Sequence, residues 1–265
     1  MLPDSKKKSI FLDIDGTLIM GEKGPFTEDL DAMREAAGRG HSVFLNTGRS
    51  LANISRALLE LPFIRGAAAG GGAHVLLKGS ENDLRTVYHK WVSEEMIARV
   101  FAWYSARPQS CVLEGEQNCY IINGPYSLFT IGNLRATDSL EEFKNQSRGD
   151  FITKLTLNRL DSEDERRFLE TFFQVNCFPN YAEGIIKGEN KAKAMGIILK
   201  ETGLERENSI AIGDSGNDLD MLRFAGMGIA MGNATPELKE AAAAVTSDCG
   251  KGGVAVALRK FVLSE

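Results

Sequence analysis

The stretch SIFLDIDGTL, residues 9–18, decides the fold of this chain. Residues 9–14 form a nearly continuous apolar run, as expected for a strand that is buried on both faces of a parallel sheet. Gly16 permits the tight turn that follows. Ligands of doubly wound sheets bind outside the carboxyl ends of the strands, so Asp13 and Asp15 are expected at the mouth of a site.

The segments on either side of this stretch repeat the order strand, helix, strand. From residue 8 to about 82 short apolar runs alternate with amphipathic segments, and the same rhythm resumes from about Lys187. This pattern predicts an α/β fold whose core is a Rossmann-like, doubly wound, mostly parallel sheet. Thr27 and Ser50 are expected to cap two helices, and another helix is expected from Asn190 to Gly203.

Between residues 83 and 187 the pattern changes to mixed α+β, with antiparallel strands expected at 84–91 and 110–123. We therefore expect a discontinuous core, residues 1–82 and 188–265, with an inserted α+β cap domain, residues 83–187. The joints are expected at the glycine-containing segments 79–83 and 184–188.

Composition excludes several classes of partner. The chain has 265 residues and a net charge of -5, with no long basic run, so a nucleic-acid surface is not expected. No apolar stretch is long enough for a membrane span. Four cysteines without C-x-x-C spacing are typical of free thiols in the cytoplasm, and they imply no metal site. His41, His74 and His89 are interpreted as isolated strand or surface residues, and the oligomeric state is not predicted.

A second acidic group, GDSGND at 213–218, follows a later apolar strand. Mg²⁺ is held by few carboxylates together with water and phosphate oxygens, so acids from two strand ends suit such a site. Asp214 directly follows the strand and is the stronger candidate. Asp218 could equally be an acid at a helix N-terminus. For Asp13 and Asp15 the chemical interpretation is that one carboxylate attacks phosphorus while the other moves protons, and the alternative is a plain acidic loop.

Two further segments could bind a phosphate group. NTGR at 46–49 follows a strand and offers the Thr47 hydroxyl and backbone N–H groups, including that of Gly48. Lys191, just inside the helix that Asn190 opens, could neutralise charge that develops on phosphorus. Taken singly, a residue such as Thr47 is more often a turn residue, and a lysine such as Lys191 is more often a solvated surface lysine.

Together these segments resemble the four motifs of the haloacid dehalogenase-like superfamily. The motifs are DIDGTL at 13–18, NTGR at 46–49, KGENK at 187–191 and GDSGND at 213–218. The large insert and the MGNA sequence at 231–234 resemble the Cof-like branch with a class II cap, type IIB. The resemblance implies a Mg²⁺-dependent phosphatase that hydrolyses a small phosphorylated metabolite, either a sugar phosphate or a phosphorylated cofactor, through an aspartyl-phosphate.

The same resemblance implies a role for each matching residue. Asp13 would be the nucleophile, Asp15 the general acid and then base, and Lys191 would orient Asp13. The residues implied in phosphate binding are Thr47, Gly48, Lys191 and Asn217. The residues implied in metal binding are Asp13, the main-chain carbonyl of Asp15, Asp214 and Asp218, with the last acting either directly or through water.

Alternatives and departures from the family pattern stay open at this point. A phosphomutase could use the same intermediate, and a catalytically silent phosphometabolite-binding protein could keep the same site. Gly71 stands where the family often has Asn, which leaves a contact near the substrate in doubt. Asn233 either contacts the phosphate site or caps the following helix.

Overall fold

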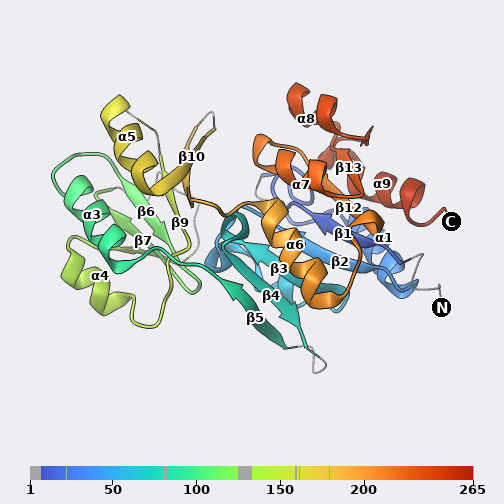
Figure 1. Cartoon of the computed structure of the whole chain (residues 1–265), viewed down its shortest axis with the longest axis horizontal. Coiled ribbons are helices and arrows are strands. Elements are labelled where there is room, and N and C mark those ends of the chain that lie inside the picture. Colours follow the sequence, from blue (N-terminus) through green and yellow to red (C-terminus); the bar gives the residue numbers. More distant parts are fainter. Residues whose placement is uncertain are drawn as a thin grey trace.

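Two sheets, each covered by helices, make up the computed structural model (Figure 1), which describes residues 7–21, 23–79, 83–124, 133–158, 160, 162–178 and 180–264. The larger sheet has eight strands. In spatial order they are β14 (Ala244–Val245), β13 (Met227–Ala230), β12 (Ser209–Gly213), β1 (Ser9–Leu12), β2 (Ser42–Asn46), β3 (Ile64–Ala69), β4 (His74–Lys78) and β5 (Leu84–His89).

The first six strands in this order are parallel, and β4 and β5 are antiparallel additions at one edge. All four residues of β1 are buried, as the apolar run predicts. The helices around this sheet are α1 (Thr27–Gly38), α2 (Arg56–Leu59), α6 (Lys191–Thr202), α7 (Leu219–Phe224), α8 (Pro236–Ala241) and α9 (Gly253–Phe261). The predicted Rossmann-like, mostly parallel core is confirmed.

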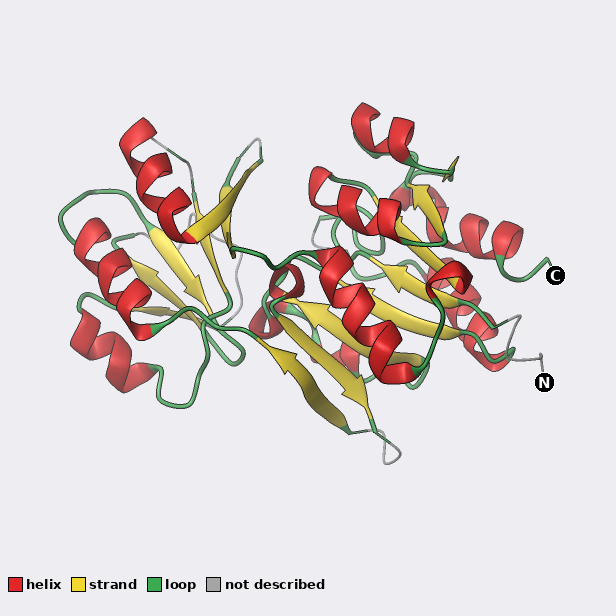
Figure 2. Cartoon of the chain, viewed as in Figure 1, coloured by secondary structure: helices red, strands yellow, loops and turns green. Residues whose placement is uncertain are grey.

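The smaller sheet carries its helices on one side, away from the larger sheet (Figure 2). Its strands, in spatial order, are β10 (Phe173–Cys177), β11 (Ala182–Ile186), β9 (Lys154–Leu157), β6 (Cys111–Glu114), β7 (Cys119–Ile122) and β8 (Leu134–Ala136). Its helices are α3 (Glu94–Tyr104), α4 (Leu140–Gln146) and α5 (Glu163–Phe172). Alternate residues such as Leu113, Leu155 and Leu157 pack against these helices. The opposite face of the smaller sheet is therefore free to face the core domain.

The boundary expected at residue 83 lies one strand too early. β5 pairs with β4 in the eight-stranded sheet, and next to this ladder Gly79 N donates to Asp83 O (2.8 Å). Residues 80–82 of that expected joint lie outside the described residues. The chain instead leaves the larger sheet after His89. Gly184 likewise lies inside β11 rather than at a joint.

Two of the predicted helix caps are wrong. Thr27 is already the first residue of α1, and Phe26 at the cap position makes no side-chain capping bond. Ser50 precedes the short 3-10 helix Leu51–Asn53, but its side chain makes no capping bond, and its hydroxyl donates to Glu114 in the cap domain (2.8 Å). Asn190 does cap α6 by accepting from Lys193 N, and Gly203 ends that helix in the left-handed conformation, as predicted.

Candidate active site

A buried lysine joins two of the predicted acids. Lys191 Nζ donates to Asp13 Oδ1 (2.7 Å) and to Asp218 Oδ1 (2.5 Å). Asp13 directly follows the central strand β1, Asp218 lies in the turn after β12, and Lys191 opens α6. All three side chains are at most 5 % exposed. The structure thus brings together three residues that are far apart in the sequence, and Lys187 of the same motif is exposed.

Asp214 completes the acidic cluster from the end of β12. Its Oδ1 accepts from Thr17 Oγ1 (3.1 Å), and one carboxylate oxygen each of Asp13, Asp214 and Asp218 lie within 4.8 Å of one another. Gly16 has a φ of +76°, and a Cβ at this position would collide with the Asp214 carboxylate. A glycine is therefore required here for both the backbone conformation and the close approach.

Both carboxylate oxygens of Asp218 are already engaged. Oδ1 accepts from Lys191, and Oδ2 accepts from the backbone N–H groups of Asp214 (2.9 Å) and Ser215 (3.0 Å). Because these bonds fix the lysine and the Asp214 backbone, the geometry favours Asp218 as a residue that positions the others.

This buried cluster contains three carboxyl groups, those of Asp13, Asp214 and Asp218, and only one amino group, that of Lys191. Burial raises the pKa of Asp13 well above its ordinary value, and Asp218 and Asp214 add to this by repulsion although Lys191 opposes it. Burial, together with Asp218, raises the pKa of Asp214 to about 7. Burial also disfavours the Lys191 ammonium, but Asp13 and Asp218 outweigh it and raise the pKa of the lysine. The site is therefore a place where an additional cation is stabilised.

Three of the predicted phosphate-binding residues, Thr47, Gly48 and Asn217, line a cavity with a volume of about 790 Å³. Thr47 and Gly48 follow β2, and Thr47 Oγ1 accepts from Arg49 N (3.2 Å). Asn217 accepts from Ser215 Oγ (2.9 Å), and its amide lies beside Gly48. Asp13 and Asp214 also line the cavity, so a phosphate group there could reach both loops.

Asp15 is placed differently from Asp13. Its side chain is 57 % exposed and forms a bidentate pair with Arg49, with Nε–Oδ2 at 2.7 Å and Nη2–Oδ1 at 2.6 Å. It still lines the cavity. The pairing with Arg49 was not anticipated from the sequence, although Arg49 belongs to the quoted NTGR motif.

The cap contributes a second polar cluster to the cavity, and sequence reasoning missed it. Lys154 Nζ donates to Glu183 Oε1 and to the backbone carbonyl of Gly48 (3.1 Å), which joins the cap to the phosphate loop. Glu114 accepts from Ser50, Asn53 and Thr156. Glu183 Oε2 is buried and has no hydrogen-bond partner among the described residues.

A weak signal for these residues exists in the sequence. In β9, Lys154 and Thr156 alternate with the core residues Leu155 and Leu157, which is the period of a strand with one polar face. Polar faces normally meet water. Only the packing of the two sheets shows that this one meets the cavity.

The two positions left open by the sequence now have structural explanations. Gly71 has a φ of +64° and donates its N–H to Thr47 O (3.1 Å), and a Cβ there would press on Ile185 of the cap. Asn233 contacts the loop beside the cavity: its Nδ2 donates to Gly16 O (2.9 Å) and its Oδ1 accepts from Cys249 N (2.7 Å). The following helix α8 is capped by Thr235 instead.

Comparison with known proteins decides the family. The sequence profile of the haloacid dehalogenase-like hydrolases matches residues 10–258. The chain belongs to this family. It is 29% identical over 259 residues to the Bacillus subtilis protein named "Putative phosphatase YkrA", covering 97% of this chain and 98% of the relative.

Two further relatives of this haloacid dehalogenase-like hydrolase also match over nearly the whole length of both chains. The 5-amino-6-(5-phospho-D-ribitylamino)uracil phosphatase YcsE of B. subtilis is 27% identical over 256 residues, covering 97% of this chain and 96% of that protein. The solved structure of the subclass IIB sugar phosphatase BT4131 superposes with a TM-score of 0.81 at 26% identity, covering 96% of this chain and 99% of that one. These relatives confirm the predicted subclass and the enzyme class, a phosphoric monoester hydrolase.

The described residues also fit the metal that the family implies. Hard carboxylate oxygens are the ligands that Mg²⁺ prefers, and Asp13 and Asp214 present them in a cluster with an excess of buried negative charge. In the part of the chain that the structure describes, no helix has both the length and the apolar character needed to cross a membrane.

Proposed function

We propose that this chain is a Mg²⁺-dependent phosphatase that hydrolyses small phosphomonoesters through an aspartyl-phosphate on Asp13. The observation that carries the proposal is the contact of Lys191 with both Asp13 and Asp218, next to the cavity that Asp13 and Asp214 line. Asp13 and Asp214 would hold the ion, with the Asp15 carbonyl as a further ligand. When bound, Mg²⁺ supplies positive charge that offsets the repulsion between the carboxylates and a phosphate dianion.

Lys191 prepares Asp13 for attack. Its ammonium fixes the orientation of one carboxylate oxygen, and its charge lies where negative charge accumulates on the transferring phosphoryl group. In the first step an Asp13 oxygen bonds to phosphorus while the bond from phosphorus to the ester oxygen breaks. Thr47, the Gly48 backbone and Asn217 would bind the phosphoryl oxygens during this step.

Asp15 would act first as the general acid and then as the general base. As an acid it gives its proton to the departing ester oxygen, and as a carboxylate it then takes a proton from the water that attacks phosphorus. That second attack breaks the bond between Asp13 and phosphorus and releases inorganic phosphate. In this structure Asp15 is paired with Arg49, so this pair has to open before Asp15 can give a proton, and the incoming phosphate group is an alternative partner for Arg49.

Trapping with hydroxylamine near neutral pH, which attacks the acyl carbonyl and releases phosphate, followed by mass spectrometry, tests the intermediate. A modified Asp13 peptide is expected from the wild type and not from Asp13→Asn, which should also release no phosphate above background. Asp31→Asn, an exposed acid on α1 that pairs with Arg34 at 2.5 Å, is the control and should behave as wild type. Full activity of Asp13→Asn would refute the proposal.

Asp15→Asn gives an independent test of the proton step. A loss of at least ~10²-fold is expected with an alkyl phosphate, as for a missing general acid, and a smaller loss with an aryl phosphate, whose leaving group needs less protonation. Equal losses with both substrates would remove Asp15 from this role. Product analysis separates the classes of function: free phosphate identifies a phosphatase, and an isomerised phosphate ester identifies a phosphomutase.

A further inference from the structure

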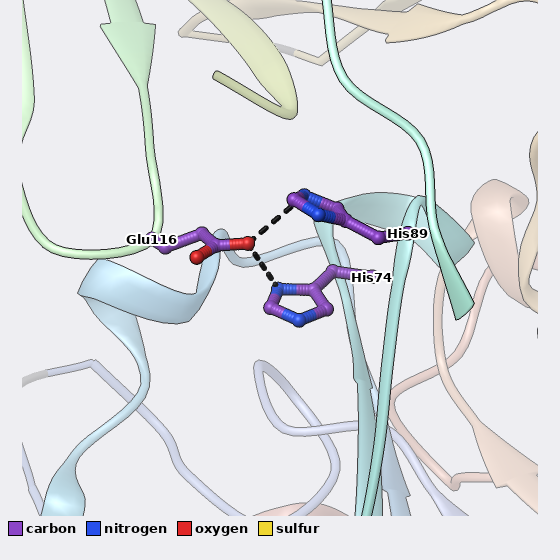
Figure 3. Close-up of side chains that lie close together, drawn as sticks. All are labelled: His74, His89 and Glu116. Carbon is purple, nitrogen blue, oxygen red and sulfur yellow. Dashed lines mark ion pairs between the residues drawn. The ribbon is translucent and has the colours of Figure 1, made fainter. Parts of the chain in front are cut away.

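Two histidines of the core and one glutamate of the cap converge on one another (Figure 3), and none of the three lines the cavity of the active site. Glu116 Oε1 lies 3.2 Å from His74 Nδ1 and 2.9 Å from His89 Nε2. His74 begins β4, His89 ends β5, and Glu116 lies in the turn between β6 and β7. The sequence-based interpretation of His74 and His89 as isolated residues is therefore wrong.

The backbone holds these three side chains in place. His74 and His89 are direct partners in the antiparallel ladder, and their rings stack at 4.5 Å between centroids. Asp150 holds the turn that carries Glu116, because its Oδ1 accepts from Glu116 N (2.8 Å) and Gln117 N (3.1 Å). The arrangement does not depend on flexible surface side chains.

The two ring nitrogens that face Glu116 are buried, and neither makes a hydrogen bond of good geometry within the described residues. The other nitrogen of His74, Nε2, lies 2.9 Å from Thr86 Oγ1. Burial lowers the pKa of His74 to about 4, so its ring is neutral near pH 7. If Nε2–H donates to Thr86, the lone pair of Nδ1 points toward a carboxylate, and a shared cation would turn this repulsion into attraction.

We propose that His74, His89 and Glu116 form a Zn²⁺ site at the joint between core and cap. Zn²⁺ binds imidazole nitrogen and carboxylate oxygen at ~2.0–2.2 Å, so neighbouring ligands of a tetrahedral site lie roughly 3.3 Å apart. The two distances to Glu116 Oε1 are close to this value. The three side chains leave the fourth position to water.

The ligand chemistry separates this site from the acidic cluster. Imidazole nitrogens favour Zn²⁺ and its neighbours in the transition series, whereas the all-carboxylate cluster around Asp13 suits Mg²⁺. The proposal therefore does not depend on the phosphatase mechanism. Because Glu116 belongs to the cap and the histidines to the core, a bound ion ties the β6–β7 turn to the larger sheet.

Metal binding by the full chain, stripped with a chelator and then kept in excess Mg²⁺, tests the site. Titration with Co²⁺ is expected to give the visible absorption of a four-coordinate ion at one equivalent per chain, and Zn²⁺ should displace it. Glu116→Gln, which keeps the side-chain volume, should weaken binding at least ~10²-fold, since even partners behind a ligand change affinity 10–100-fold. His89→Gln should do the same.

Three controls keep the result specific. His41→Gln changes the remaining histidine, whose Nδ1 accepts from Lys8 N, Cys177→Ser removes the exposed thiol, and Asp13→Asn changes the acidic cluster. All three should bind as wild type. Zn²⁺ should also raise the melting temperature of the wild type and not of Glu116→Gln, whose unliganded melting temperature shows whether it folds.

Several results would overturn the proposal. Absence of Co²⁺ and Zn²⁺ binding by the wild type would leave a proton between the histidines and Glu116 rather than a metal. Unchanged binding by a folded Glu116→Gln would exclude this residue as a ligand. Loss of binding in Cys177→Ser or Asp13→Asn would assign the ion to those positions.

Discussion

Two buried lysines, one in the core and one in the cap, belong to polar clusters that border the same cavity, and their surroundings differ. Lys191 of the core lies among Asp13, Asp218 and Asp214, three acids for one base. Lys154 of the cap lies between Glu183 and, at 3.7 Å, Glu114, two acids for one base. The core cluster thus has the greater excess of buried negative charge. It suits a metal ion and a phosphoryl group, whereas the cap cluster suits uncharged hydrogen-bond donors.

The two clusters also arise from different parts of a fold. The core residues lie in loops at strand ends, where the backbone can turn each carboxylate toward one point. The cap residues lie on adjacent strands: Glu114 is opposite Lys154 in the β6–β9 ladder, and Glu183 is opposite Thr156 in the β9–β11 ladder. A rigid sheet face recognises shape and hydrogen bonding. We therefore expect the core cluster to control the rate of the chemical step and the cap cluster to control binding.

The largest expected effect is the difference in kcat between a variant of Lys191 and a variant of Lys154. Lys191→Gln should lower kcat ~10³-fold, because one preorganised charge at the transferring group is lost. Lys154→Gln should lower kcat at most ~10-fold and act mainly on KM, because Lys154 contacts the phosphate loop only through the Gly48 carbonyl. Steady-state kinetics with a phosphate ester measures both.

Matched melting temperatures of these two variants serve as the control for folding, since both lysines are buried. Similar losses of kcat in the two variants would contradict the division of labour between core and cap.

Sequence predicts the core cluster well and the cap cluster poorly, for a physical reason. Asp13 and Asp214 occur where apolar strands stop, and Gly16 marks the backbone conformation that brings them together, so the signal is local. Glu114 and Glu183 show no such local mark, because their partners come from other strands and from the loop that contains Ser50. The β5 strand was misassigned for a similar reason, since antiparallel strands at a sheet edge resemble those of the cap.

The excess charge of the core cluster predicts a pH dependence of stability. In chelated protein the pKa of Asp214 is raised from 3.8 to about 7, mainly by burial, so the folded state binds more protons than the unfolded state between these values. The free energy of unfolding should therefore fall as pH rises from about 4 to 7. Each unit corresponds to about 1.4 kcal/mol, so the loss is at most ~4 kcal/mol.

Urea unfolding across this range, in the presence of a chelator, measures the effect. Asp214→Asn should have a shallower slope, and the difference between the two proteins isolates this group from Asp13, which acts in the same direction. Saturating Mg²⁺ should restore stability of the wild type near pH 7. Parallel slopes for wild type and variant would show that Asp214 titrates normally.

Glu183→Gln tests the cap cluster at its unpaired oxygen. The amide can still accept from Lys154 through its carbonyl, but its other end no longer accepts a bond from a substrate hydroxyl at the cavity. KM for a sugar phosphate should rise ~10-fold, in line with a lost bond to a charged group, while kcat changes less than about 3-fold.

An aryl phosphate without hydroxyl groups provides the comparison, and its KM should stay the same in Glu183→Gln. Glu114→Gln is the matched variant, because Glu114 is satisfied within the protein and should affect stability more than KM. A KM increase that is equal for both substrates would show that Glu183 acts on the phosphate end rather than on the leaving group.

Ser50→Ala should produce the smallest effect, at a contact between the core domain and the cap cluster. The Ser50 hydroxyl donates to Glu114 across the boundary between core and cap, and Asn53 donates to the same oxygen at 2.7 Å. Because that second donor remains, the carboxylate is not left unpaired, and the loss in unfolding free energy should be about 1 kcal/mol. Ser105→Ala, at an exposed position in the cap, should change it by less than about 0.5 kcal/mol. If the two variants unfold at the same urea concentration, the bond between Ser50 and Glu114 contributes no net stability, and the cap must be held to the core by its other contacts, such as that of Lys154 with Gly48.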